Sequence, residues 1–422
     1  MEKPKKDNNT GKLKKKINIR EETMQKIKEM GLEDLVTEIA EMEPQAAMKY
    51  ITEMLLNLFM LKERDFFLKS DDSEENKANG FYPRNLACML GNLSLKIPRD
   101  RSGQFRPQVL PKEWQRYDKD FQDLLLNLIL QSYSPSRIRS LLNSLNLPYS
   151  MKEIEELKDS LYAKAKELRM KELPSECFAL FIDAYHTEIK DEEVKRVRKA
   201  VIYSIIGMDM NLRKDFFGYY VFFGSEKKGD WLKIFNDLIA RGLKRVLLIT
   251  SDDFPGVSDA IKTLFPQTDH QLCFVHMQRN IFRNMSKEDA SRFNEEINRI
   301  KLISNYEEAV NAFETLCNQF ESKYSSYIKM LKTNKERYLS YKKYPEAIRK
   351  HIYTTNIVEN INSKLEGLRV NHGGYFQSLK TAEISIYVIV NRIIQGRWRK
   401  PLTVSKEVLY EIRQIFNSRF TE

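Results

Sequence analysis

Three carboxylates in this 422-residue sequence have positions that suit metal-dependent chemistry. Asp183 lies inside an apolar stretch typical of a strand, where a carboxylate is destabilising unless it is paired or metal-bound. Asp252 follows the apolar stretch 246–249, at the strand end where open α/β sheets bind ligands, and Glu359 lies near the start of a predicted helix. Two carboxylates from neighbouring strands and one from a facing helix would hold two Mg²⁺ (or Mn²⁺) ions roughly 3.5–4 Å apart, one activating a nucleophile and one stabilising a leaving oxygen.

Each acid also has a purely structural interpretation. Asp183 would pair with a lysine at a strand end, and Asp252 would cap the following helix. Glu359 would complete a capping box that begins at Asn356. An apolar stripe on the same predicted helix consists of Ile357, Ile361, Leu365 and Leu368. Because Glu359 lies off this stripe, it is free to face a site, but its position alone leaves both interpretations open.

Other candidate residues carry weaker signals. Cys273 and His276 have the spacing of metal ligands, but they form one half-site without a second pair, so a structural zinc is not expected. Trp231 belongs to the apolar stripe of a predicted helix, which favours the core over a stacking platform. The sequence has neither a glycine-rich phosphate loop nor a Gly-x-Ser-x-Gly motif, so nucleotide hydrolysis and esterase chemistry have no support.

The elements that must position the three acids follow one another after Pro174. The pattern predicts three strands, a helix, a strand, a helix and a last strand, at residues 178–189, 199–208, 216–223, 231–239, 246–249, 260–265 and 272–275. Three strands before the first helix, followed by alternation, give a mixed α/β sheet with helices on its faces. This is the order of the ribonuclease-H-like fold.

The rest of the chain reads as mainly helical. The predicted parts are a basic disordered tail (1–20), a helical N-terminal region with a short strand at 85–98 (21–112), a helix-turn-helix-like DNA-binding region (113–172), the catalytic core (173–285 and 351–400), a helical insertion (286–350) and a C-terminal helix (401–422). The helix-turn-helix pattern is weak, because any small helical bundle produces it.

Composition limits the class of protein. A net charge of +11 suits a polyanionic partner, although charge alone does not choose between DNA and RNA. No apolar run approaches the length of a membrane span, so no membrane segment is expected. Four widely spaced cysteines and a polar, lysine-rich start without a secretory signal predict a reducing, cytoplasmic location.

Five short segments occur in a distinctive order. They are residues 98–105 (Pro-Arg-Asp-Arg-Ser-Gly-Gln-Phe), 181–184 (Phe-Ile-Asp-Ala), 241–252 (Arg-Gly-Leu to Ser-Asp), 271–280 (Gln-x-Cys-x-x-His-x-x-Arg-Asn) and 354–362 (Thr-Thr-Asn-Ile-Val-Glu-Asn-Ile-Asn). Together they resemble the bacterial mutator-type insertion-sequence transposases, relatives of the plant Mutator elements. The chain departs from that pattern at Asp253, where the family usually has Gly, and at Tyr338, where a Trp is common.

The resemblance implies a retroviral-integrase-like catalytic core, an Asp-Asp-Glu triad of Asp183, Asp252 and Glu359, Mg²⁺, and a helical insertion before the Glu. It also implies that the partner is double-stranded DNA, namely terminal inverted repeats and target DNA, bound by a homodimer or higher oligomer. Candidate DNA contacts are Arg99, Arg101, Arg137, Arg139, Arg279, Asn280, Asn356 and Lys364. Two alternatives are a structure-specific nuclease on the same fold, which cleaves without joining, and a captured transposase acting as a DNA-binding regulator.

Overall fold

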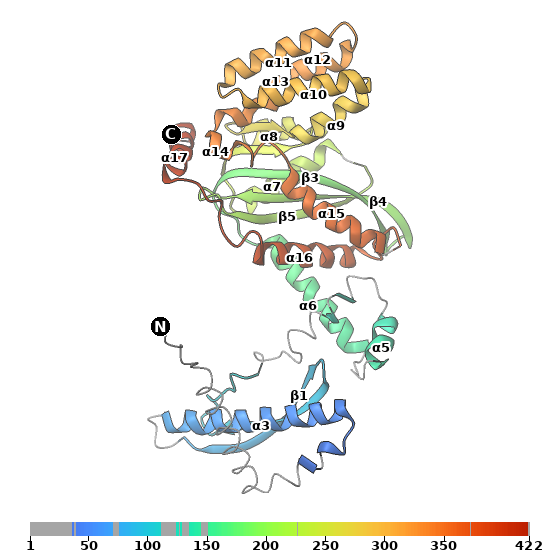
Figure 1. The fold of residues 1–422 in the computed structure, drawn as a ribbon, viewed down its shortest axis with the longest axis vertical. Coiled ribbons are helices and arrows are strands. Elements are labelled where there is room, and N and C mark those ends of the chain that lie inside the picture. The colour runs from blue at the N-terminus through green and yellow to red at the C-terminus, as the bar shows by residue number, and fades with distance from the viewer. Residues whose placement is uncertain are drawn as a thin grey trace, which may run out of the picture. The chain divides into compact units, whose positions relative to one another are not determined.

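The computed structural model describes residues 36–37, 39–70, 76–110, 124–125, 127–128, 135–144, 151–225, 227–371 and 373–420. The chain divides into two compact units, one of residues 1–129 and 133–154 and the other of residues 130–132 and 155–422 (Figure 1). Among the described residues, no helix is long and apolar enough to cross a membrane. The predicted basic tail, residues 1–20, lies outside the described residues.

The first unit contains a β-hairpin that the sequence patterns did not predict. Helix α3 (Pro44–Ser70) packs on an antiparallel pair formed by β1 (Ala78–Cys88) and β2 (Gly91–Asp100) (Figure 1). Alternate side chains of β2 point inward and meet Met60 of α3 in a small core. The prediction of a single strand in a helical region was therefore wrong. The sequence pattern missed β1 because most of its side chains are exposed and its apolar residues do not alternate with polar ones.

Two helices of the predicted DNA-binding region are described, α5 (Pro135–Ser144) and α6 (Met151–Met170). The connection between them, residues 145–150, and residues 113–123 lie outside the described residues. The helix-turn-helix arrangement therefore stays a prediction. Arg139 of α5 is exposed, and the side chain of Arg137 is not among those described.

The second unit is built on a five-stranded sheet of order β5-β4-β3-β6-β7. Its strands are β3 (Glu176–Asp191), β4 (Arg196–Met208), β5 (Lys214–Phe223), β6 (Arg245–Ser251) and β7 (Asp269–Leu272). The first three are antiparallel neighbours, whereas β6 runs parallel to β3 and β7 runs parallel to β6. The predicted sequence of three strands, helix, strand, helix, strand is confirmed.

The last strand, however, lies earlier than predicted. It covers residues Asp269–Leu272, and Phe274 already begins helix α9 (Phe274–Asn284). The apolar pattern missed this strand because two of its buried residues, His270 and Gln271, are polar. The polar side-chain atoms of both residues form hydrogen bonds with neighbouring elements, which offsets the cost of removing them from water.

Helices cover both faces of the sheet (Figure 1). On one face, α7 (Lys228–Ala240) and α8 (Val257–Leu264) bury a core that includes Trp231, as the sequence predicted for that residue. On the other face lie α9, α15 (Asn356–Asn371) and α16 (Leu379–Gln395). The insertion forms a group of helices beyond one edge of the sheet: α10 (Lys287–Leu302), α11 (Tyr306–Phe320), α12 (Ser325–Thr333), α13 (Lys335–Leu339), the 3-10 helix η1 (Ser340–Lys343) and α14 (Glu346–Arg349).

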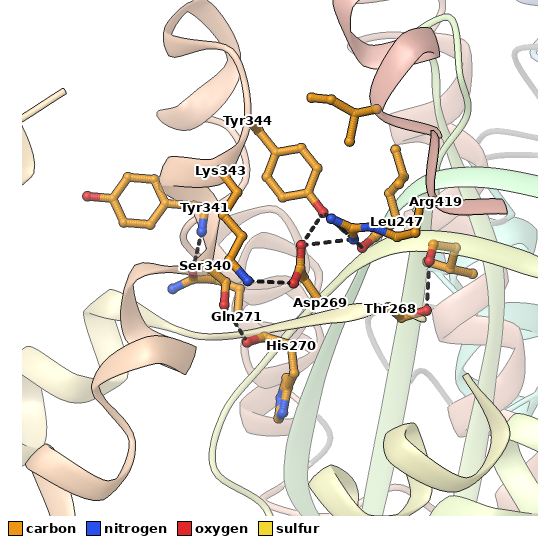
Figure 2. A network of polar contacts seen from close by, with 12 residues as sticks. Leu247, Thr268, Asp269, His270, Gln271, Ser340, Tyr341, Lys343, Tyr344 and Arg419 are labelled. Carbon is orange, nitrogen blue, oxygen red and sulfur yellow. Dashed lines mark hydrogen bonds and ion pairs between the residues drawn. The ribbon is translucent and has the colours of Figure 1, made fainter. Parts of the chain in front are cut away.

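A carboxylate on β7 joins three parts of the second unit. Asp269 accepts a hydrogen bond from Tyr344 (2.9 Å) and pairs with Lys343 (2.9 Å), both at the end of the insertion (Figure 2). It also pairs at 2.9 Å with Arg419 of the C-terminal helix α17 (Lys406–Phe420). Arg419 donates a further bond to the carbonyl oxygen of Leu247 on β6. The sheet edge, the insertion and α17 are therefore held at one point.

We expect Arg419→Leu to lower the free energy of unfolding by about 1–3 kcal/mol, because it removes charge-assisted hydrogen bonds from a largely buried carboxylate. The matched control is Arg413→Leu on the same helix, whose partner Glu176 lies at a more exposed site and keeps Arg245. That change should cost less than about 1 kcal/mol. Urea unfolding of both variants measures the difference, and equal losses would contradict the role given to Asp269.

Candidate active site

Asp183 is a buried carboxylate on the central strand β3. Its neighbour Ile182 points into the core under α7 and α8, so Asp183 points to the opposite face, toward α15. Its side chain accepts a hydrogen bond of 2.8 Å from the amide of Asn362. Burial raises the pKa of Asp183 to about 6, against the opposing effects of nearby His276 and of the Asn362 bond. Among the described residues no Lys or Arg pairs with it, so the lysine-paired alternative is not found.

Asp252 directly follows the last residue of β6, the strand that runs parallel beside β3. The register of the two strands pairs Phe181 with Thr250 last, and Asp183 and Asp252 each lie two positions beyond that pair. The Asp252 carboxylate accepts a 2.8 Å bond from the backbone N–H of Asp253. It does not cap α8, since that helix begins at Val257 after Gly256 and receives no side-chain cap.

The carboxylate of Asp253 contacts the insertion. It accepts a 3.3 Å hydrogen bond from the amide of Asn334 and lies 3.6 Å from the guanidinium of Arg337. The residue that departs from the family pattern is therefore engaged by the insertion, and Asp252 is left as the acid beside β3.

Glu359 lies in the first turn of α15 and is held by two cationic side chains. Arg279 of α9 donates two hydrogen bonds to it, of 2.7 and 3.3 Å, and the ring of His276 lies 3.7 Å away. Asn356 is the first residue of α15, and the Glu359 carboxylate bonds to Arg279 rather than to a backbone N–H at the helix start. The capping-box interpretation of Glu359 is therefore not supported.

The Cys273–His276 segment lies between the acids. Cys273 is buried at the start of α9, and its sulfur accepts bonds from the N–H and hydroxyl of Thr355, the residue before α15. Burial acts to lower the pKa of His276, but a hydrogen bond with Cys273 and the charges of Asp252 and Asp183 outweigh it and raise the pKa to about 9. These interactions favour the protonated form of the imidazole beside the two aspartates.

As they stand, the three acids do not form a ready metal cluster. Among the described residues, no group of three or more His, Cys, Asp and Glu is arranged to hold a metal ion, and this includes the Cys273–His276 half-site. The Glu359 carboxylate is bonded to Arg279 instead.

The remaining sequence candidates fall in different places. Arg99 and Arg101 are exposed on the first unit and flank the buried Asp100, whose carboxylate accepts hydrogen bonds from the following loop. In the second unit Asn356 and Lys364 are exposed on α15, Asn280 is half-buried, and Arg279 is engaged by Glu359. Sequence reasoning missed Asn362, although its spacing of three residues from Glu359 places both on one side of a helix.

Comparison with known proteins identifies a family for this chain. The family described as Transposase, Mutator family, matches residues 23–399. A probable transposase for insertion sequence element ISRM3-like of Sinorhizobium fredii is 27% identical over 375 residues, 88% of this chain and 92% of the relative. The transposase for insertion sequence element IS1201 of Lactobacillus helveticus is 26% identical over 339 residues, 79% of this chain and 89% of the relative.

Similarity to solved structures is low. The chain is 13% identical to the Drosophila P element transposase strand transfer complex, and the match covers 76% of this chain and 94% of that one. The TM-score of 0.23 is too low to support an inference about this chain. The family match, in contrast, spans most of the sequence. The chain belongs to the Mutator family of transposases, which are enzymes of DNA transposition.

Proposed function

We propose that this chain is an insertion-sequence transposase that binds terminal inverted repeats and carries out metal-dependent DNA cleavage and strand transfer with Asp183, Asp252 and Glu359. The observation that carries the proposal is Asp183. It is a buried carboxylate that, among the described residues, pairs with no Lys or Arg, lies two positions beyond the last residue pair of β3 and β6, and accepts a hydrogen bond from Asn362 of α15. Such a group is costly unless a site needs its charge.

The strand order supports a ribonuclease-H-like core made of residues 173–285 and 351–400. Three antiparallel strands followed by two parallel ones place the C-terminal end of β6 beside the middle of β3, on the face that α15 packs against. In this proposal residues 286–350 are an insertion in that core, and the region before residue 172 supplies recognition of the DNA ends. Arg99, Arg101 and Arg139 are exposed there and suit phosphate contacts.

The three acids have the donor chemistry for two Mg²⁺ or Mn²⁺ ions once Glu359 leaves its contact with Arg279. All three candidate ligands are carboxylates, the donors that these ions prefer. A hydrogen bond with Cys273 and the charges of Asp252 and Asp183 raise the pKa of His276, so a positive charge is favoured next to the two aspartates. Glu359 would exchange its contact with Arg279 for a role as ligand, and Arg279 would then be free to bind a DNA phosphate. When bound, the ions activate water and stabilise the leaving oxygen.

The surrounding residues hold these groups in place. Asn362 fixes the orientation of Asp183, and the contact of Thr355 with Cys273 ties the start of α15 to α9. In cleavage, a water oxygen bonds to phosphorus as the P–O3′ bond breaks, leaving a 3′-hydroxyl and a 5′-phosphate. In joining, that 3′-hydroxyl attacks a second phosphodiester and another 3′-oxygen leaves. Both steps are in-line displacements in which the protein supplies position and charge, and neither needs a covalent protein intermediate.

The test uses the full-length protein and labelled DNA from the two sides of its gene, incubated with Mg²⁺ or with a chelator. We expect end-specific cleavage and joined products with Mg²⁺ only. Cleavage without joining would indicate a nuclease instead. Binding without either product would indicate a regulator.

A pair of neighbouring variants tests which aspartate is the second ligand. Asp252→Asn should abolish cleavage, because it removes the charge next to Asp183. Asp253→Asn should reduce cleavage only modestly, since the Asp253 carboxylate contacts Asn334 and Arg337 of the insertion. Both variants are assayed at saturating Mg²⁺ on the same DNA. The reverse ranking would show that Asp253 is the ligand.

A further inference from the structure

A line of hydrogen bonds connects the helical insertion to the residue that precedes the proposed metal site. The guanidinium of Arg337, on α13, donates to the hydroxyl of Ser258 on α8. The Ser258 hydroxyl lies 3.0 Å from Nδ1 of His270, and Nε2 of the same ring lies 2.9 Å from the hydroxyl of Ser251. The Ser251 hydroxyl donates at 2.8 Å to the backbone carbonyl of Asp252.

Only one direction satisfies this line of bonds. Arg337 has no acceptor atom, so Ser258 accepts from it, and the direction of the bond between Ser258 and Nδ1 of His270 is set from the other end of the line. At that end, the Ser251 hydroxyl donates its hydrogen bond to the carbonyl of Asp252, so it accepts one from Nε2–H of His270. A neutral imidazole provides one donor and one acceptor, and the line requires Nε2 to carry the proton.

The surroundings keep the ring neutral. His270 and Ser251 are buried. Burial and the charges of Arg337 and Lys262 lower the pKa of His270 to about 3. The ring therefore stays neutral under ordinary assay conditions, and the direction of the line is fixed.

A second contact runs in parallel from the same part of the insertion. The buried amide of Asn334 donates to Asp253, and its oxygen accepts from Arg337. The segment from Ser251 to Ser258 is thus held from the insertion at two places, Asp253 and Ser258, and Asp252 directly precedes the first of them.

We infer that His270 and Ser258 are positioning residues for Asp252, through which Arg337 of the insertion sets the position of that carboxylate. The inference rests on the proposed function, in which Asp252 is a metal ligand. It gives the insertion a part in the chemistry, since the insertion supplies the first donor of the line. Groups that orient a metal ligand typically change metal affinity more than they change the fold.

The first test reads the ring of His270 directly and needs no catalysis. The full-length protein is labelled with ¹⁵N-histidine, and the His270 signals are assigned by their loss in His270→Gln. We expect one neutral tautomer with the proton on Nε2 and an unprotonated Nδ1. A proton on Nδ1, or a mixture of the two tautomers, would overturn the inference.

The second test measures the Mg²⁺ concentration that gives half-maximal cleavage. Ser258→Ala and Ser251→Ala should raise it about five- to tenfold, the worth of one hydrogen bond, with DNA-end binding unchanged. Ser258→Thr keeps the hydroxyl and should restore the wild-type value. Ser291→Ala is the matched control, because its hydroxyl only bonds back to Lys287 within α10.

The outcomes separate this inference from the proposed function. A wild-type protein without Mg²⁺-dependent cleavage would refute the function. A wild-type protein that cleaves, together with a Ser258→Ala variant that has lower thermal stability but the wild-type Mg²⁺ requirement, would refute the positioning role alone. A higher Mg²⁺ requirement in Ser258→Ala and Ser251→Ala, reversed in Ser258→Thr, supports it.

Discussion

Replacing Glu359 with Gln should give a folded protein that binds DNA ends and does not cut them. Gln keeps the shape of the side chain but removes the negative charge that a Mg²⁺ ligand needs. A bound metal contributes several kcal/mol of transition-state stabilisation, and about 1.4 kcal/mol is a factor of ten in rate, so we expect a loss on the order of a thousandfold. Thermal stability should change little, because the partner Arg279 is half exposed and its ion pair is worth less than about 1 kcal/mol.

The control for this variant is Glu366→Gln, two turns further along α15. Glu366 is engaged by Arg369 and by the hydroxyl of Tyr185, which together hold its pKa near 2. It should keep cleavage close to the wild-type rate while losing some stability. Melting, end binding and Mg²⁺-dependent cleavage are measured on both proteins. If Glu359→Gln cleaves DNA normally and Glu366→Gln loses cleavage, Glu366 and not Glu359 is the third acid.

The second large effect is expected from Asp183→Asn, which should abolish cleavage and stabilise the metal-free protein. The pKa of Asp183 is about 6 when folded, against 3.8 for the free side chain, so the folded state binds more protons between these values. Wild-type stability therefore falls as pH rises through that window, and the cost is fully present above pH 6. Because Asn carries no charge, the variant avoids this cost, and its free energy of unfolding at pH 8 should be higher than that of wild type by about 3 kcal/mol at most.

Denaturant unfolding in chelator at pH 8 and pH 4 measures this difference, which should shrink at the lower pH. Adding Mg²⁺ should stabilise wild type and not Asp183→Asn, since a ligand that binds only the folded state raises its stability. The matched control is Asp191→Asn on the same strand. Its bond from Arg198 lowers the pKa of Asp191, so this variant should lose stability at pH 8. A stability loss in both variants would show that the Asp183 charge is compensated.

Much of the core was accessible from sequence because its strands are apolar and regularly spaced. The stretches around Asp183 and before Asp252 are buried on both faces, and such strands are plain in composition. The sequence pattern missed the strands that are not apolar. In β7 the buried residues include the polar His270 and Gln271, and in β1 most side chains are exposed.

The sequence patterns proposed three acids as candidate ligands but did not predict the side chains that bind them. The contacts of Glu359 with Arg279 and of Asp253 with Asn334 join residues 80 and 81 positions apart. No local pattern encodes such pairs, because they depend on how α9 and the insertion pack. Arg279, a candidate DNA contact from sequence, is in this structure a partner of Glu359.

The wide separation of these contacts along the chain bears on when the site forms. Asn362 reaches Asp183 across 179 residues, and Thr250 bonds to the carbonyl of Ile352 across 102. Closing such distant contacts is slow compared with forming local helices, so the insertion can fold on itself before α15 docks on the sheet. During synthesis, β3 and β6 emerge long before α15 does. The chain therefore passes through a long period in which it holds two of its acids but not the third, and a partly made copy is unable to cut DNA by the proposed chemistry.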